Sequence, residues 1–153
     1  MPTYDPTAAN NSFSVAYAEF STDVTVSGTT EAAANSVVEA PGFIPNGRDS
    51  FWLEFVAPGV SPGASAGASV VLVVYDNGSP LFAGTSAIAQ VINNAAAAYT
   101  TSVSTKLKIK SPTAVVHVYS VRAFRAVANG TVNGTSGGIG RPGSINITRE
   151  GGA

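Results

Sequence analysis

The sequence contains no cysteine and only one histidine. Without cysteine the chain can form neither disulfide frameworks, nor thiolate zinc sites, nor a cysteine nucleophile. With one histidine, a transition-metal site would need carboxylates for most of its ligands, and the 9 acidic residues are dispersed along the chain. We therefore expect no bound metal and no obligatory organic cofactor.

Charge is also scarce, because Lys, Arg, Asp and Glu together make up 11% of the 153 residues. Globular domains carry about 25% charged residues, so Ser, Thr, Asn, Gly and Ala must cover most of this surface. The net charge of −1 provides no broad field that would attract a polyanion. Nucleic-acid binding is accordingly disfavoured.

Long apolar segments are missing as well. No stretch of about 18 apolar residues occurs, which argues against a transmembrane helix. Residues 1–6 lack the basic flank and apolar run of a secretory signal peptide. If the protein acts outside a cell, we expect it to leave by lysis or as part of a particle.

What the sequence does contain is short apolar runs separated by 16 glycines and 9 prolines. We expect a polar N-terminal arm over residues 1–13 and one domain over residues 14–153. The strand candidates are 14–27, 37–38, 51–56, 69–75, 81–83, 102–110, 114–126 and 144–148. Eight or so short strands with regular turn signals predict an all-β antiparallel sandwich, most simply a jelly roll.

Several of these segments carry a more detailed expectation. The β-branched run 69–75 predicts a central strand buried on both faces, followed by a hairpin at Asp76-Asn77-Gly78-Ser79. Residues 102–110 alternate apolar residues with lysines, which indicates an edge strand with lysines outward. The Ala-rich segment 86–98 favours strand plus loop over a helix, and 114–126 is the longest strand candidate.

His117 is the one candidate for acid–base catalysis. It lies between Val116 and Val118, so we expect it inside a strand, and the sequence has no Gly-x-Ser-x-Gly elbow. A packed or interface imidazole is the favoured interpretation. We predict no catalytic, cofactor-binding or metal-binding residue, and hence no enzyme.

Three other motifs have structural explanations. Gly138, Gly140 and Gly143 match the dinucleotide fingerprint formally, but Pro142 and the following β-like residues leave no helix to receive a phosphate. Asp76-Asn77-Gly78 lacks the remaining ligands of a calcium loop. Trp52 lies in an apolar strand, which favours core or interface packing over an exposed platform for sugars.

An ordered series of segments resembles a domain of minor tail proteins from phages of actinobacteria. The resemblance covers nearly everything after residue 13. Its segments are Val15–Phe20, Val24–Ser27, Thr29–Ala32, Val37–Pro41, Glu54-Phe55 with Ala57-Pro58, Tyr75–Ser79, His117–Ala123 and Pro142–Arg149. The resemblance implies a trimeric jelly-roll head, similar to tumour-necrosis-factor-type and complement-type heads.

This resemblance implies a non-enzymatic structural protein on the virion surface, near the host-contacting end of the tail. In the family the domain usually closes a longer chain, whereas here Met1 precedes the first strand by about a dozen residues. A capsid decoration protein that stabilises the shell would suit this length equally well, and a carbohydrate-binding adhesion module is a further alternative. The expected partners are sister subunits of a homotrimer and a tail or major capsid protein. A host cell-surface glycan is compatible with the tail location, and no nucleic acid or membrane is expected.

The trimer also has an argument from the residues themselves. Val70–Tyr75 and Phe51–Val56 are apolar on both faces, which exceeds what one two-sheet core needs. We expect part of this surface to contact sister subunits. The arm over residues 1–13 is expected to be mobile in isolation and to become ordered when it docks on the virion.

Overall fold

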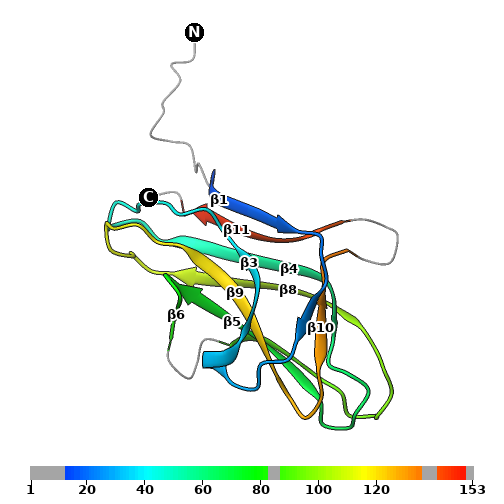
Figure 1. Ribbon diagram of the computed structural model, residues 1–153. Coiled ribbons are helices and arrows are strands. Elements are labelled where there is room, and N and C mark those ends of the chain that lie inside the picture. The colour runs from blue at the N-terminus through cyan, green and yellow to red at the C-terminus, as the bar shows by residue number, and fades with distance from the viewer. Residues whose placement is uncertain (1–12, 83–86, 136–140, 151–153) are drawn as a thin grey trace.

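The computed structural model describes residues 13–82, 87–135 and 141–150, and within these the regular secondary structure is almost entirely strand (Figure 1). The elements are β1 (Phe13–Phe20), β2 (Val24–Val26), the 3-10 turn η1 (Glu31–Ala33), β3 (Asn35–Glu39), β4 (Phe51–Ser61), β5 (Ser69–Asp76), β6 (Ser79–Pro80), β7 (Ala87–Ile92), β8 (Thr101–Ile109), β9 (Tyr119–Ala126), β10 (Gly130–Asn133) and β11 (Gly143–Arg149). The predicted arm lies outside the described residues except for Phe13, which begins β1.

The strands form two antiparallel sheets. The first sheet has the order β1-β11-β4-β10-β2, with β8 paired to the other side of β4. The second sheet has the order β3-β9-β5-β6, with β7 also paired to β5. The prediction of an all-β antiparallel sandwich is confirmed. Because Phe13 pairs with Arg149, both ends of the described chain lie at one end of the molecule (Figure 1).

The core fills the space between the two sheets. Alternate residues of each strand point inward, as the two-residue period of a strand requires. Leu53 and Phe55 on β4 and Leu72 and Val74 on β5 are fully buried, and the Phe55 ring stacks on Phe20 at 6.1 Å between centroids. One continuous core therefore joins both sheets.

β5 is buried on its outward face as well, which confirms the prediction of a central strand. Val73 and Tyr75 point away from the core, yet they are only 1% and 2% exposed. The Tyr75 hydroxyl donates to the Glu31 carbonyl of η1, and the Arg122 guanidinium lies 4.4 Å from the Tyr75 ring. Val73 and Tyr75 are thus covered by the same chain and leave little surface for a sister subunit, and the contact between subunits stays a prediction.

β4 presents a different outward face. Phe51, Leu53 and Phe55 point into the core, whereas Trp52 and Val56 point outward and stay partly exposed. On this face β8 contributes the lysines that the alternating pattern predicts, with Val103 and Ile109 turned inward. Among the described pairings β8 joins only β4, so the prediction of an edge strand is confirmed.

Two predicted strand boundaries are wrong. The return strand of the hairpin is Ser79–Pro80, before the predicted start at Leu81, although the Leu81 N–H still donates to the Val74 carbonyl at 2.9 Å; Ala83 lies outside the described residues. Residues 114–118 do not belong to β9, because their backbone groups bond outside its ladder, as described below. As a result β9 has 8 residues, and the longest described strand is β4 with 11.

Two further expectations on local structure have clear outcomes. Ala87–Ile92 is a strand, so the prediction of strand plus loop in the Ala-rich segment is confirmed. Within the described residues, no helix is long and apolar enough to cross a membrane.

Candidate functional site

The hairpin between β5 and β6 positions the most elaborate polar cluster near the sole histidine. Asn77 and Gly78 have φ values of 49° and 80°, the left-handed conformation that a two-residue turn between antiparallel strands requires. Asn77 tolerates this conformation well, and Gly78 does so without strain. The Asp-Asn-Gly turn therefore fixes Asp76 and Asn77 at one end of the second sheet.

His117 comes from a segment 41 residues further along the chain. It lies before β9 in an isolated bridge with Phe43, so the expectation that it lies inside a strand is wrong. Its N–H donates to the Phe43 carbonyl at 2.9 Å, and its carbonyl accepts from the Phe43 N–H at 3.1 Å. The ring is buried, with 7% of the residue exposed, as expected for a packed imidazole.

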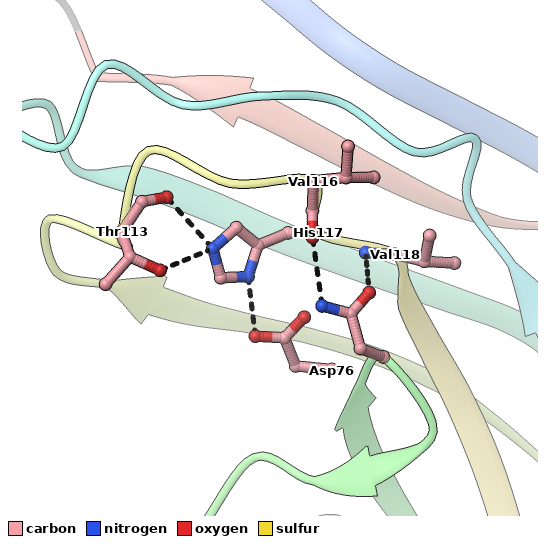
Figure 2. Close-up of polar contacts among 6 residues, drawn as sticks. Asp76, Thr113, Val116, His117 and Val118 are labelled. Atoms are coloured by element: carbon pink, nitrogen blue, oxygen red, sulfur yellow. Dashed lines mark hydrogen bonds and ion pairs between the residues drawn. The ribbon is translucent and has the colours of Figure 1, made fainter.

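Both ring nitrogens of His117 face acceptors (Figure 2). Nδ1 lies 2.7 Å from Oδ2 of Asp76, and Nε2 lies 3.0 Å from the carbonyl oxygen of Thr113 and 3.2 Å from its hydroxyl. A carbonyl oxygen only accepts, and so does an ionised carboxylate. The contacts hold the ring between Asp76 and Thr113, and the tautomer decides which ring nitrogen donates.

Asn77 holds the same segment through three further hydrogen bonds. Its side-chain amide donates to the Val116 carbonyl at 2.9 Å, and its side-chain oxygen accepts from the Val118 N–H at 3.0 Å (Figure 2). The Asn77 N–H donates to the Val118 carbonyl at 2.9 Å. These bonds occupy the backbone groups that a ladder would use, which is why β9 begins only at Tyr119.

The cluster also has the order of a catalytic triad: the Asp76 carboxylate, the His117 imidazole and the Thr113 hydroxyl. In a triad the second nitrogen must accept the proton of the hydroxyl. Here Nε2 lies within hydrogen-bond distance of both the Thr113 carbonyl and the Thr113 hydroxyl. These contacts join the β5–β6 hairpin to the segment before β9, so the cluster is a structural clamp.

Sequence reasoning found His117 and the hairpin but did not bring them together. Asp76 and Thr113 were not identified as partners of His117, because the two contacts depend on how the hairpin meets the segment before β9. The Asp-Asn-Gly turn was the one local signal, since it places a carboxylate at a defined end of a strand.

Trp52 is neither core nor a bare platform. It is half-buried on the outward face of β4, with the Lys106 and Lys108 ammonium nitrogens 5.0 and 5.5 Å from the ring centroid. Lys106 also pairs with Glu54 at 2.6 Å, and Lys108 with Glu150 at 2.6 Å. These contacts make a mixed aromatic and charged surface, which suits interface packing.

The remaining sequence motifs give no site. Gly138 and Gly140 lie outside the described residues, whereas Gly143 begins β11 directly against the Phe20 ring, where a Cβ atom would clash. This close approach explains why residue 143 is glycine, since any other side chain would collide with the ring. Among the described residues no three His, Asp or Glu side chains are grouped so that they could hold a metal ion.

Comparison with known proteins adds no relative to this picture. No family model matches the chain, and no curated protein matches it.

Proposed function

We propose that this protein is a non-enzymatic structural component on the exterior of a phage virion, built as a trimeric jelly-roll head. The favoured location is the tail near its host-contacting end, as the resemblance of residues 14–153 to minor tail protein domains implies. The observation that carries the proposal is the pairing order of the eight longer strands.

These eight strands, in chain order, are β1, β3, β4, β5, β7, β8, β9 and β11. They pair as β1-β11-β4-β8 in one sheet and β3-β9-β5-β7 in the other. Each sheet thus alternates early and late strands, which is the arrangement produced when a long hairpin wraps into two Greek keys. This order supports the jelly roll within the antiparallel sandwich.

The outward face of the first sheet supports self-association. Tyr17 and Val56 are 49% and 40% exposed on it, and Trp52, on the same strand as Val56, lies under the lysines of β8. The lysines lie on one margin of the sheet, whereas Glu19 lies on the β1 margin opposite. In a ring of identical subunits, one margin of each copy meets the other margin of its neighbour, so opposite charges would face each other across each contact.

The trimer is tested by multi-angle light scattering of the purified full chain. We expect three times the 15.4 kDa mass of one chain. A mass of 15.4 kDa at micromolar concentration would contradict self-association. Gold-labelled antibody against the protein, applied to intact virions, then distinguishes the tail from the capsid shell, where a decoration protein would be found. Absence of label from both would contradict a virion location.

A further inference from the structure

A pocket of about 450 Å³ opens beside the His117 clamp. Asp76, Tyr119 and His117 line it on one side, and Leu81, Ile109 and Pro112 contribute apolar surface. Sites for small molecules have volumes of about 300–1,000 Å³ and combine apolar walls with a few placed polar groups. In size and lining the pocket matches such a site.

Two buried polar atoms at this pocket have no hydrogen-bond partner among the described residues. They are Oδ1 of Asp76 and the hydroxyl oxygen of Tyr119, whose residue is only 1% exposed. Leaving a buried polar group unpaired costs about 1–3 kcal/mol, so native proteins rarely do so without a function or a bound molecule. The pocket is far larger than one bridging water molecule requires.

The chemistry of these two atoms restricts what can bind between them. The Asp76 oxygen can only accept a hydrogen bond. Burial, and then the nearby Asp76 carboxylate, raise the pKa of Tyr119 above its usual range, so its hydroxyl remains a donor at neutral pH. A ligand group must therefore donate to one atom and accept from the other. An alcohol hydroxyl does both.

Other ligand classes fit less well. An ionised ligand carboxylate has no proton to give to Asp76, and any anion there would also meet the negative charge of that side chain. An ammonium ion cannot accept from Tyr119, and it would meet the ammonium groups of Lys108 and Lys110, which also line the pocket. The apolar surface of Leu81 and Ile109 suits the C–H face of a ring, and Lys110 can donate to additional hydroxyls.

We infer that the pocket formed by Asp76, Tyr119, Ile109 and Lys110 binds a pyranose residue of a glycan. One sugar hydroxyl bridges Asp76 and Tyr119, and the C–H face of the ring lies on Leu81 and Ile109. This assignment goes beyond the proposed virion function. The pocket lies within one chain and does not depend on the trimer. A monomeric protein that binds the sugar would therefore contradict the trimer alone, and a trimer that does not bind it would contradict the glycan site alone.

The test is NMR titration of the isotope-labelled full chain with the methyl glycosides of glucose, galactose, mannose and N-acetylglucosamine. We expect at least one glycoside to give saturable shifts at the amides of Asp76, Asn77 and residues 108–119, with millimolar affinity. Absence of saturable shifts for all four would overturn the inference. Equal shifts with glycerol would also overturn it, because the site would then bind any hydroxyl or only water.

Tyr119→Phe separates binding from a structural role. It removes a hydroxyl that has no protein partner, so urea denaturation should show unchanged or higher stability while the affinity for the same glycoside falls roughly 3–10-fold, as expected for one hydrogen bond. Tyr99→Phe is the matched control, because its hydroxyl bonds the Ile92 carbonyl outside the pocket. Undiminished affinity in Tyr119→Phe would contradict the assignment. If Tyr119→Phe fails to fold, Lys110→Gln replaces it, because Lys110 is exposed. We then expect a smaller loss of affinity for the same glycoside.

Discussion

The outward faces of β4 and β5 look alike in sequence and differ in the folded chain. Both strands are rich in apolar residues on both sides. On β5, Val73 and Tyr75 are covered by the same chain, and only 1% and 2% of their surfaces remain exposed. On β4, Val56 remains 40% exposed, and Trp52 is covered only in part by the lysines of β8. The two strands therefore use their surplus apolar residues for different purposes.

The difference shows that an apolar outward face of a sheet can be covered in two ways, by the same chain or by another one. η1 and Arg122 close over β5 within one chain, so this face contributes to the stability of the monomer. The face of β4 has no comparable cover among the described residues, and it is the surface that the proposed trimer would use. Any argument for the trimer rests on the first sheet alone.

The sharpest test of this comparison introduces a carboxylate on each face. Val73→Asp buries an unpaired charge, which costs several kcal/mol out of a total stability of about 5–15 kcal/mol, so we expect the chain to unfold. Val56→Asp should leave the fold intact within roughly 0.5 kcal/mol but reduce the trimer to monomer. Circular dichroism with urea and light scattering measure the two effects. A folded Val73→Asp variant would show that β5 is less well covered than its exposure indicates.

The next largest effect concerns the clamp at the end of β5. His117→Gln removes one of the charge-assisted hydrogen bonds to Asp76 or Thr113, and we expect a loss of roughly 1.5–3 kcal/mol in the free energy of unfolding. Thr113→Val should cost less, because Nε2 keeps its bond to the Thr113 carbonyl. Any hydrolase activity on host cell-wall polysaccharide should be absent in all three proteins. An activity of the parent protein that His117→Gln abolishes without unfolding would restore the catalytic interpretation.

A third prediction follows from the raised pKa of Tyr119. In the unfolded chain its hydroxyl ionises near pH 10, whereas in the folded chain it keeps its proton to higher pH. The unfolded state therefore binds fewer protons above about pH 10, and stability should fall as the pH rises further. Tyr119→Phe should reduce this alkaline loss, leaving the part due to Tyr75, whose pKa is also raised by burial. Urea midpoints across alkaline pH measure the slope, with Tyr99→Phe as control. An unchanged slope in Tyr119→Phe would contradict this role.

The smallest effect is expected at the ion pair on the exposed face of β4. Lys106 and Glu54 lie 2.6 Å apart, but their side chains are 51% and 42% exposed. Such pairs contribute about 0.2–1 kcal/mol, so Lys106→Ala should change the free energy of unfolding by less than about 1 kcal/mol. A double-mutant cycle with Glu54→Gln isolates the coupling. A coupling free energy well above 1 kcal/mol would show that this ion pair is less exposed to solvent than an ordinary surface pair.

Much of the fold follows from local patterns. The β-branched run of β5, the Asp-Asn-Gly turn and the lysine alternation of β8 each predicted an observed element, because strand periodicity and turn chemistry act over a few residues. The errors occur where a side chain competes for backbone groups. Asn77 bonds the backbone groups of Val116 and Val118, and His117 pairs with Phe43 instead of a neighbour in the β9 ladder.

The candidate site was less predictable than the fold. His117 was correctly expected to be buried, yet its partners Asp76 and Thr113 carried no spacing that would identify them. The pocket was not predicted at all, because it requires the end of β5, the end of β8 and the start of β9 to meet. Tyr119 looked like any core aromatic residue until the structure placed its hydroxyl without a partner.

By itself the sequence determined that this protein is an all-β chain with no cysteine chemistry and a central strand at 69–75, since composition and periodicity act locally on every residue. Only the tertiary structure decided which apolar face is covered, which acceptors hold the imidazole and where two buried oxygens lack partners. These features depend on contacts between segments about 40 residues apart. Such contacts arise only when the sheets pack, because burial is a property of the whole fold and not of a segment.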